Sequence, residues 1–322
     1  MFVSPRAFCP AAVTLPSPSG LPAVVSYGTP TSTGGTPPTT VSCSPASGST
    51  FPVGATTVTC TATDQVGRTD ACAFSVMVAA PPRLSVTRFL AFGDSITWGE
   101  DGRNSVMSLG TLGALRPRVQ FPAPDTYPGA LQASLAARYT AQSPQVFNAG
   151  KQGEAVTDPA TFPRFVGFTS SRAYDVVLLM EGANDLGGTD TAAIVAGLGR
   201  MVDDAKSRNL KVFLATLPPQ NPDGFDPAER GVQYQAVGPF NDQLKSLAVS
   251  KDVLLVDVNR AFNGDLTLIG SDGLHPTAAG YHLIADTFLA SIRQTLELPA
   301  ATSSNPARAL PLFVSPRPRQ TR

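Results

Sequence analysis

Short apolar runs alternate with longer amphipathic stretches along the middle of the chain. The apolar runs have the length of strands and lie at 87–92, 144–148, 174–180, 211–216 and 252–256. The amphipathic stretches have the length of helices and lie at 127–140, 190–207, 236–250 and 276–297. Because strands buried on both faces read as continuous apolar runs, this alternation predicts a five-stranded parallel sheet with helices on both faces.

The first 83 residues show a different pattern. Runs rich in Val, Thr and Ser at 23–27, 39–43, 56–62 and 73–78 are separated by clusters of Gly, Pro and Ser, and helix-favouring residues are scarce. Short, regularly spaced strands with such turns are typical of a small antiparallel β-sandwich. We therefore predict an all-β domain at 1–79, a proline-stiffened linker at 80–87 and an α/β domain at 88–298.

Composition and charge narrow the function classes. The chain has 24 basic and 24 acidic residues, and this balance gives no support for binding to nucleic acid. No apolar run reaches the ~20 residues of a membrane span, and the first residues lack the basic start and apolar core of a secretory signal. We interpret the abrupt start as a truncated reading frame. Residues 299–322 are rich in Pro and Ser, contain arginines but no acidic residue, and are predicted to be disordered.

All four cysteines, Cys9, Cys43, Cys60 and Cys72, lie in the predicted all-β domain. An even number of cysteines in one small domain favours two disulfides and an oxidising compartment. The sequence alone allows three ways of pairing them, and buried free thiols are the alternative. Because the chain has no Cys-x-x-Cys pair, we expect no zinc site.

Polar motifs follow the predicted strands of the α/β domain. They are Gly93-Asp94-Ser95, the segment 148–154 with Gly153, the segment 181–185 with Asn184, and the segment 271–276 with Asp272 and His275. The carboxyl ends of parallel strands share one edge of the sheet, where ligands bind in open α/β folds. We therefore expect the four motifs to converge at that edge.

In this order the four motifs resemble the four blocks of the SGNH hydrolases, also called the GDSL esterase/lipase family, over about 88–297. The resemblance implies a three-layer α/β/α fold of flavodoxin-like type and an enzyme that hydrolyses carboxylic esters. It also implies that Ser95 is the nucleophile, His275 the general base and Asp272 the acid that orients the base. The groups that it assigns to the oxyanion hole are the backbone N–H groups of Ser95 and Gly153 and the side-chain amide of Asn184.

Each of these roles agrees with the chemistry of the residue. A serine hydroxyl needs a nearby base to take its proton, and the chain has only two histidines, His275 and His282. His275 follows Asp272 by three residues, so a short turn lets the carboxylate hold one ring nitrogen while the other faces Ser95. Pro276 suits the first position of the helix that follows. His282 is predicted to lie on that last helix, in packing or at the surface.

Structural roles for the same motifs are the alternatives. Ser95 can cap a helix, with Thr97 and Glu100 arranged as a capping box. Asn184-Asp185 can cap the helix at 190 or form a turn, and the fourth motif can be only a turn. One shared site explains all four motifs together, whereas separate structural roles explain them one at a time.

The order of residues in the all-β domain resembles the hyalin-repeat (HYR) domain, an immunoglobulin-like module of extracellular proteins. The residues that carry the resemblance are Cys43, Phe51, Gly54, Cys60, Asp64, Gly67, Cys72, Phe74 and Val76. The resemblance implies the disulfides Cys9–Cys72 and Cys43–Cys60. The module has no constellation of titratable residues, so we predict no chemistry for it. Contact with a glycan or a cell surface is one role that fits it, and a passive spacer is another.

Two long connections, 100–124 and 217–235, are the predicted binding loops for the acyl and alcohol parts of the substrate. Their apolar content is modest, which favours short acyl chains. The apolar residues that we single out in them are Met107, Leu109, Leu112, Phe121 and Phe225.

These patterns predict a secreted or extracellular serine esterase that acts on a small ester and uses neither metal nor cofactor. Ser95 attacks the ester carbonyl, an acyl-enzyme forms, and water activated by His275 releases the acid. One alternative is a carbohydrate acetyl esterase that the HYR module brings to an acetylated polysaccharide. A second alternative is a non-catalytic extracellular adhesion protein.

Overall fold

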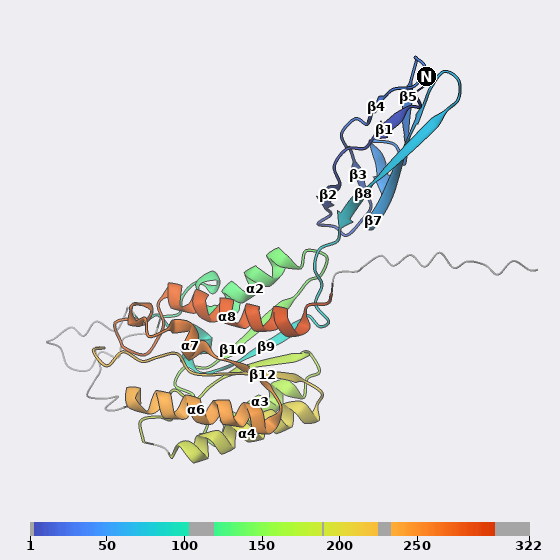
Figure 1. Cartoon of the computed structure of the whole chain (residues 1–322). Helices are drawn as coiled ribbons and strands as arrows, with labels where there is room; N and C mark the ends of the chain where they lie inside the picture. The colour runs from blue at the N-terminus through green and yellow to red at the C-terminus, as the bar shows by residue number, and fades with distance from the viewer. Residues whose placement is uncertain (1–2, 103–118, 189, 225–232, 300–322) are drawn as a thin grey trace, which may run out of the picture. The chain divides into compact units, whose positions relative to one another are not determined.

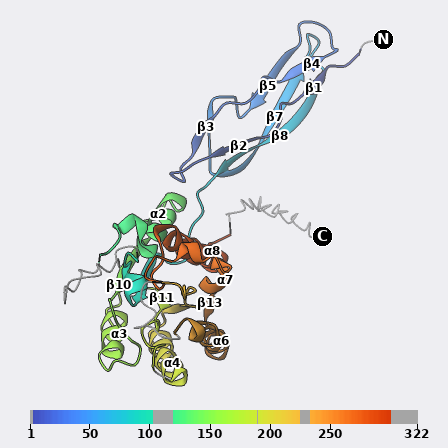
Figure 2. The same ribbon diagram turned by 90° about the vertical axis from the view of Figure 1, so that its left-hand side faces the viewer.

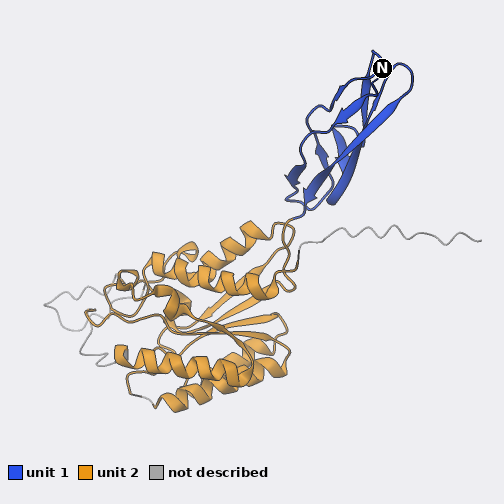
Figure 3. Cartoon of the chain, in the orientation of Figure 1, with its two compact units in different colours: residues 1–80, 300–322 blue, residues 81–299 orange. Residues whose placement is uncertain are grey.

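The structure of the chain is a computed structural model that describes residues 3–102, 119–188, 190–224 and 233–299. The chain divides into two compact units, residues 1–80 and residues 81–299 (Figure 3). Each unit has its own hydrophobic core. The predicted tail at 299–322 lies, after its first residue, outside the described residues.

The described part of the first unit is built from strands of three to eleven residues. They are β1 (Arg6–Phe8), β2 (Val13–Pro16), β3 (Ala23–Val25), β4 (Thr31–Thr33), β5 (Thr40–Ser44), β6 (Ser49–Phe51), β7 (Gly54–Thr63) and β8 (Thr69–Ala79). The main sheet has the order β2-β8-β7-β5, and two further sheets pair β1 with β4 and β3 with β6. Alternate residues of β8 are buried, so Phe74, Val76 and Val78 face the core. This confirms the predicted all-β sandwich.

One strand pair of the first unit differs from the predicted antiparallel arrangement. β2 runs parallel to β8, with Val13 opposite Val76. The two strands come from opposite ends of the domain, so no tight hairpin forces them to run in opposite directions. The prediction also missed β1, β2, β4 and β6, because strands of three or four residues are too short to show an alternating pattern.

The first unit contains the disulfides Cys9–Cys72 and Cys43–Cys60, which are the pairs that the family resemblance implies. Cys43 of β5 lies directly opposite Cys60 of β7, with 4.0 Å between the two Cα atoms. The Cys60 side chain is fully buried in the core. Covalent closure of these loops restrains the unfolded chain, which matters for a domain with so small a core.

The second unit is a three-layer α/β/α domain. Its described elements are β9 (Arg88–Gly93), α1 (Ser95–Trp98), η1 (Ala123–Asp125), α2 (Tyr127–Arg138), β10 (Gln145–Gly150), α3 (Thr161–Thr169), β11 (Val176–Met180), α4 (Thr191–Ser207), β12 (Lys211–Ala215), α6 (Gln233–Lys251), β13 (Leu254–Val256), α7 (Val258–Phe262), η2 (Leu266–Leu268) and α8 (Ala278–Leu296). The five strands are parallel and have the order β10-β9-β11-β12-β13. Helices α2 and α8 cover one face of this sheet, and α3, α4 and α6 cover the other (Figures 1 and 2). The predicted flavodoxin-like fold is confirmed.

Three strands end at the same level of the sheet. Gly93, the last residue of β9, lies opposite Gly150 of β10 and Met180 of β11. The segments that follow these strands therefore leave the sheet side by side. A Cβ atom on Gly150 would lie 2.0 Å from the backbone nitrogen of Trp98, so glycine is needed for α1 to pack this closely against β10.

The last helix begins later than predicted. Helix α8 starts at Ala278, and the Thr277 hydroxyl caps it by accepting the Gly280 N–H at 3.3 Å. The prediction that Pro276 is the first helical residue was wrong, because the threonine supplies the cap and Pro276 instead forms a β-bridge with Ile269.

Candidate active site

Ser95 follows β9 directly and begins α1. The N-cap of this helix is Asp94, whose Oδ1 accepts the Ile96 N–H at 2.9 Å. Its Oδ2 accepts the Ala183 N–H at 3.3 Å and so connects the turn to the segment after β11. Burial raises the pKa of Asp94 to about 6, and these N–H groups oppose the rise only in part. The alternative that Ser95 itself caps the helix was wrong, because Asp94 is the N-cap and the Ser95 hydroxyl contacts His275 instead.

His275 lies between Ser95 and Asp272. Its Nε2 is 2.7 Å from Ser95 Oγ, and its Nδ1 is 2.5 Å from Asp272 Oδ2. All three residues are almost fully buried, with exposed fractions of 1% for Ser95, 3% for His275 and 5% for Asp272. The structure therefore brings together the three residues that the family resemblance singles out as a catalytic triad.

Asp272 is held as an ionised acceptor. Its Oδ1 accepts the backbone N–H groups of Leu274 and His275, each at 2.9 Å. Burial by itself raises the pKa of Asp272, but the hydrogen bond and charge of His275 and the two backbone N–H groups outweigh it. The net effect holds this pKa below its ordinary value.

Hydrogen bonds from neighbouring segments fix the loop that carries Asp272 and His275. The Gly102 carbonyl accepts the Asp272 N–H and the Ser271 hydroxyl, each at 3.1 Å. The Gly273 carbonyl accepts the Asn221 N–H at 2.8 Å. The orientation of the imidazole is thus set by backbone contacts as well as by the carboxylate.

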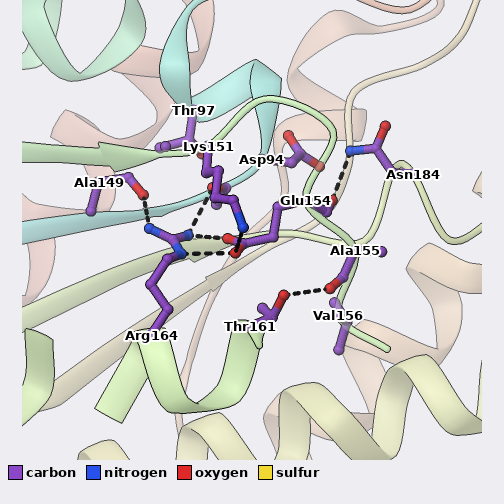
Figure 4. Close-up of polar contacts among 12 residues, drawn as sticks. Asp94, Thr97, Ala149, Lys151, Glu154, Ala155, Val156, Thr161, Arg164 and Asn184 are labelled. Carbon is purple, nitrogen blue, oxygen red and sulfur yellow. Dashed lines mark hydrogen bonds and ion pairs between the residues drawn. The ribbon is translucent and has the colours of Figure 1, made fainter. Parts of the chain in front are cut away.

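Gly153 and Asn184 lie in the segments that leave the sheet on either side of β9. Gly153 has a φ of +66°, a conformation that favours glycine. The side-chain amide of Asn184 donates to the Glu154 carbonyl at 2.8 Å (Figure 4). Because an amide nitrogen carries two N–H groups, this bond leaves one N–H for another acceptor.

Sequence reasoning missed the position of Glu100 and the role of Asp185. Glu100 Oε2 lies 3.7 Å from His275 Nε2, although the sequence suggested only a capping role for this residue. Asp185 accepts the N–H groups of Val156 and Thr157, at 2.8 and 3.1 Å, and so holds the loop after β10. The alternative that it caps the next helix was wrong, because Asp190 caps α4. No local signal identifies either role, since both contacts join segments far apart in the sequence.

The other residues singled out from the sequence lie away from this cluster or outside the described residues. His282 is on α8 with its side chain 52% exposed, 3.5 Å from Asp125, so its predicted surface position is confirmed. Phe121 is 5% exposed and its ring contacts that of Tyr281, so it belongs to the hydrophobic core of this unit. The remaining apolar loop residues, Met107, Leu109, Leu112 and Phe225, fall outside the described residues.

The described residues contain neither a metal-binding cluster nor a membrane-spanning helix. No group of three or more His, Cys, Asp or Glu side chains in this part of the chain could hold a metal ion. None of its helices combines the length and the apolar character needed to cross a membrane.

Comparison with known protein families matches two parts of the chain. The model of the GDSL-like lipase/acylhydrolase family matches residues 91–283, and the model of the HYR domain matches residues 3–78. The chain belongs to the GDSL-like lipase/acylhydrolase family and carries a HYR domain in front of the hydrolase domain. The matched domain therefore belongs to a family of carboxylic ester hydrolases.

Individual relatives are distant. A multidomain esterase of Ruminococcus flavefaciens is 25% identical over 261 residues, which are 72% of this chain and 33% of that protein, so the chain spans about a third of its length. The solved structure of Est24, a carbohydrate acetylesterase from Sinorhizobium meliloti, is similar with 21% identity and a TM-score of 0.52, over 63% of this chain and 99% of that one. An aryl esterase from M. smegmatis is similar with 20% identity and a TM-score of 0.52, over 65% and 99%. These two structures show the shared fold.

Proposed function

We propose that the protein hydrolyses short-chain carboxylic esters through an acyl-enzyme on Ser95. The observation that carries the proposal is the unbroken series of short contacts from Ser95 Oγ through the His275 ring to Asp272. A serine in this arrangement has a base for its proton, and the base has an acid that sets its tautomer.

The chemistry follows from the positions of these atoms. His275 Nε2 takes the Oγ proton while Oγ attacks the ester carbonyl, and Asp272 stabilises the imidazolium that forms. The oxyanion is bound by the backbone N–H groups of Ser95 and Gly153 and by the second N–H of the Asn184 amide. His275 then protonates the leaving alcohol, and the same base activates the water that releases the acid. Every group in this scheme belongs to the chain, so the proposal calls for no cofactor.

Replacement of Ser95 by Ala tests the proposal. Hydrolysis of p-nitrophenyl acetate, butyrate and octanoate is expected to fall by more than ~10³-fold, with acetate the best substrate of the wild type. Ser291→Ala is a matched control, because its hydroxyl bonds within α8 to the Thr287 carbonyl. Hydrolysis by Ser95→Ala at the rate of the wild type would refute the mechanism.

A carbohydrate acetyl esterase is the second candidate, and the HYR domain in the same chain favours it. In this case the full chain releases acetate from acetylated xylan faster than a chain that lacks residues 1–80, while both hydrolyse p-nitrophenyl acetate equally. Equal rates on xylan contradict targeting by the HYR domain. If the protein is instead an inactive adhesion protein, the wild type is expected to hydrolyse every ester as slowly as Ser95→Ala does.

We also infer that the protein works in an oxidising, extracellular setting. The HYR domain is of extracellular type, and the two disulfides of the first unit are stable only where thiols are not kept reduced. Gel mobility without and with reductant tests this for protein purified from its natural host. Identical mobility under the two conditions contradicts the inference.

A further inference from the structure

Arg164 and Glu154 form an ion pair beside the loop that carries Gly153 (Figure 4). Arg164 lies on α3, and its Nε donates to Glu154 Oε1 at 2.8 Å while its Nη2 donates to Glu154 Oε2. The Glu154 side chain is fully buried, and that of Arg164 is 21% exposed. A buried carboxylate depends on such a partner, because an unpaired charge in the interior is strongly disfavoured.

The same guanidinium binds the backbone at two strand ends. Its Nη1 donates to the Ala149 carbonyl at 2.8 Å, and its Nη2 lies 3.5 Å from the Gly93 carbonyl. Gly93 directly precedes Asp94 and Ser95, and Ala149 belongs to the neighbouring strand β10. The group also lies over the Phe92 ring, 4.0 Å from its centroid. Because guanidinium donors are fixed in one plane, a single side chain sets the relative positions of both strand ends and the loop.

Glu154 extends this set of contacts to the other side of the site. Its backbone carbonyl accepts one N–H of the Asn184 amide at 2.8 Å. That bond fixes the plane of the amide and therefore the direction of its second N–H. Arg164 holds the Glu154 carboxylate, and the residue before Glu154 is Gly153. The two proposed oxyanion donors are thus linked through the backbone of Glu154, whose carboxylate is held by Arg164 and, at 3.2 Å, by Lys151.

We propose that Arg164 and Glu154 are positioning residues for the oxyanion hole. The pair sets the separation between the Gly153 N–H and the Asn184 amide. This inference rests on the proposed function at Ser95. A purely structural pair would instead change the amount of folded enzyme or its melting temperature, and leave the turnover of each folded active site unchanged.

Arg164→Lys tests the proposal, because lysine keeps the charge but cannot make the forked contact and reach both carbonyls. The kcat per titrated active site is expected to fall about 10–100-fold with KM changed less than about threefold, since misplaced donors act on the transition state. Phenylboronic acid forms a tetrahedral adduct with the serine, so its inhibition constant is expected to weaken by a similar factor. In an Asn184→Ala background the further loss caused by Arg164→Lys is expected to be smaller.

Arg88→Lys is the matched control. The Arg88 guanidinium forks onto Asp175 at 2.6 and 3.1 Å and donates to the Arg172 carbonyl at 3.1 Å, but it lies at the opposite end of β9. This change is expected to leave kcat and the inhibition constant of the boronate within about twofold of the wild-type values, because only the carboxyl end of the sheet carries the proposed site. Glu154→Gln keeps the side-chain shape and the backbone carbonyl, and it replaces Arg164→Lys if that variant does not fold.

The outcomes separate this inference from the function on which it rests. Wild-type kcat per active site and unchanged boronate inhibition in Arg164→Lys overturn the positioning role, even if the melting temperature falls. If Arg164→Lys gives that result and Ser95→Ala is inactive, the positioning role is overturned but the proposed function stands. An active Ser95→Ala overturns the proposed function and the inference with it.

Discussion

Replacement of Glu181 by Met is expected to stabilise the α/β domain. Glu181 follows β11 and is 1% exposed, and neither of its carboxyl oxygens has a hydrogen-bond partner among the described residues. Burial raises its pKa well above 4.5. The charges of Asp94, Glu154 and Asp185 raise this pKa further, and that of Arg164 lowers it in part. The folded protein therefore keeps a proton on this carboxyl well above the pH at which an exposed Glu loses it.

Two effects determine how much Glu181→Met is expected to raise the free energy of unfolding. A buried polar group without a partner costs about 1–3 kcal/mol, and an apolar side chain of similar length removes that cost. The second effect depends on pH, because above pH 4.5 the unfolded chain releases a proton that the folded protein keeps. Stability therefore falls as pH rises, by about 1.4 kcal/mol per pH unit, until Glu181 ionises in the folded state. Met does not titrate, so its advantage grows over the same range.

Unfolding by urea between about pH 5 and 7 measures both effects for wild type, Glu181→Met and Glu181→Gln. Gln does not titrate but keeps unpaired polar atoms, so it removes only the pH-dependent effect and serves as the matched control. The free energy of unfolding of Glu181→Met should exceed that of the wild type by a margin that widens with pH. A margin that is zero, negative or independent of pH would show that Glu181 is not a neutral, unpaired acid.

Three further changes test the site and the first domain. Asp272→Asn is expected to lower kcat on p-nitrophenyl acetate about 10⁴-fold with little change in KM, because an amide N–H facing Nδ1 selects the wrong tautomer of the His275 ring. Asn184→Ala is expected to lower kcat about 10²–10³-fold by removing one oxyanion donor, and a loss below about threefold contradicts that role. The double substitution Cys43→Ser and Cys60→Ser removes a disulfide between residues 17 apart in the sequence. It is expected to lower the free energy of unfolding of the first domain by about 3 kcal/mol without changing kcat, and denaturant unfolding and the esterase assay measure these two quantities.

The inner strands of the central sheet, β9, β11 and β12, are predictable because they are nearly continuous apolar runs. Every residue of β11 is buried, and so is every residue of β9 after Arg88. The last strand is shorter than its apolar run suggests. Asp252 has a φ of +51° and terminates the preceding helix, so β13 begins at Leu254 and not at 252. The left-handed backbone conformation of Asp252, just before the apolar run, leaves no trace in the hydrophobic pattern.

Helix α3 was not predicted, because the usual signals for the start and the interior of a helix are missing from its nine residues. It contains Pro163 and Gly167, and no side chain caps its first turn. It forms because it packs on the sheet, where the Phe165 and Phe92 rings lie 5.0 Å apart. The contacts of Arg164 could not be predicted from the sequence either. Two of its partners are backbone carbonyls that come within reach only after α3 has packed.

The convergence of the motifs depends on strand order, which the hydrophobic pattern does not encode. Any parallel sheet collects the carboxyl ends of its strands at one edge, but the segments nearest to Ser95 are those that follow the neighbours of β9. In the observed order these neighbours are β10 and β11, so the segments with Gly153 and Asn184 leave the sheet on both sides of the serine. The chain winds to one side of β9 and then to the other, and this change of direction opens the crevice in which such folds bind ligands. The motifs therefore predict the site only jointly with the family resemblance, which supplies the strand order that brings the motifs together.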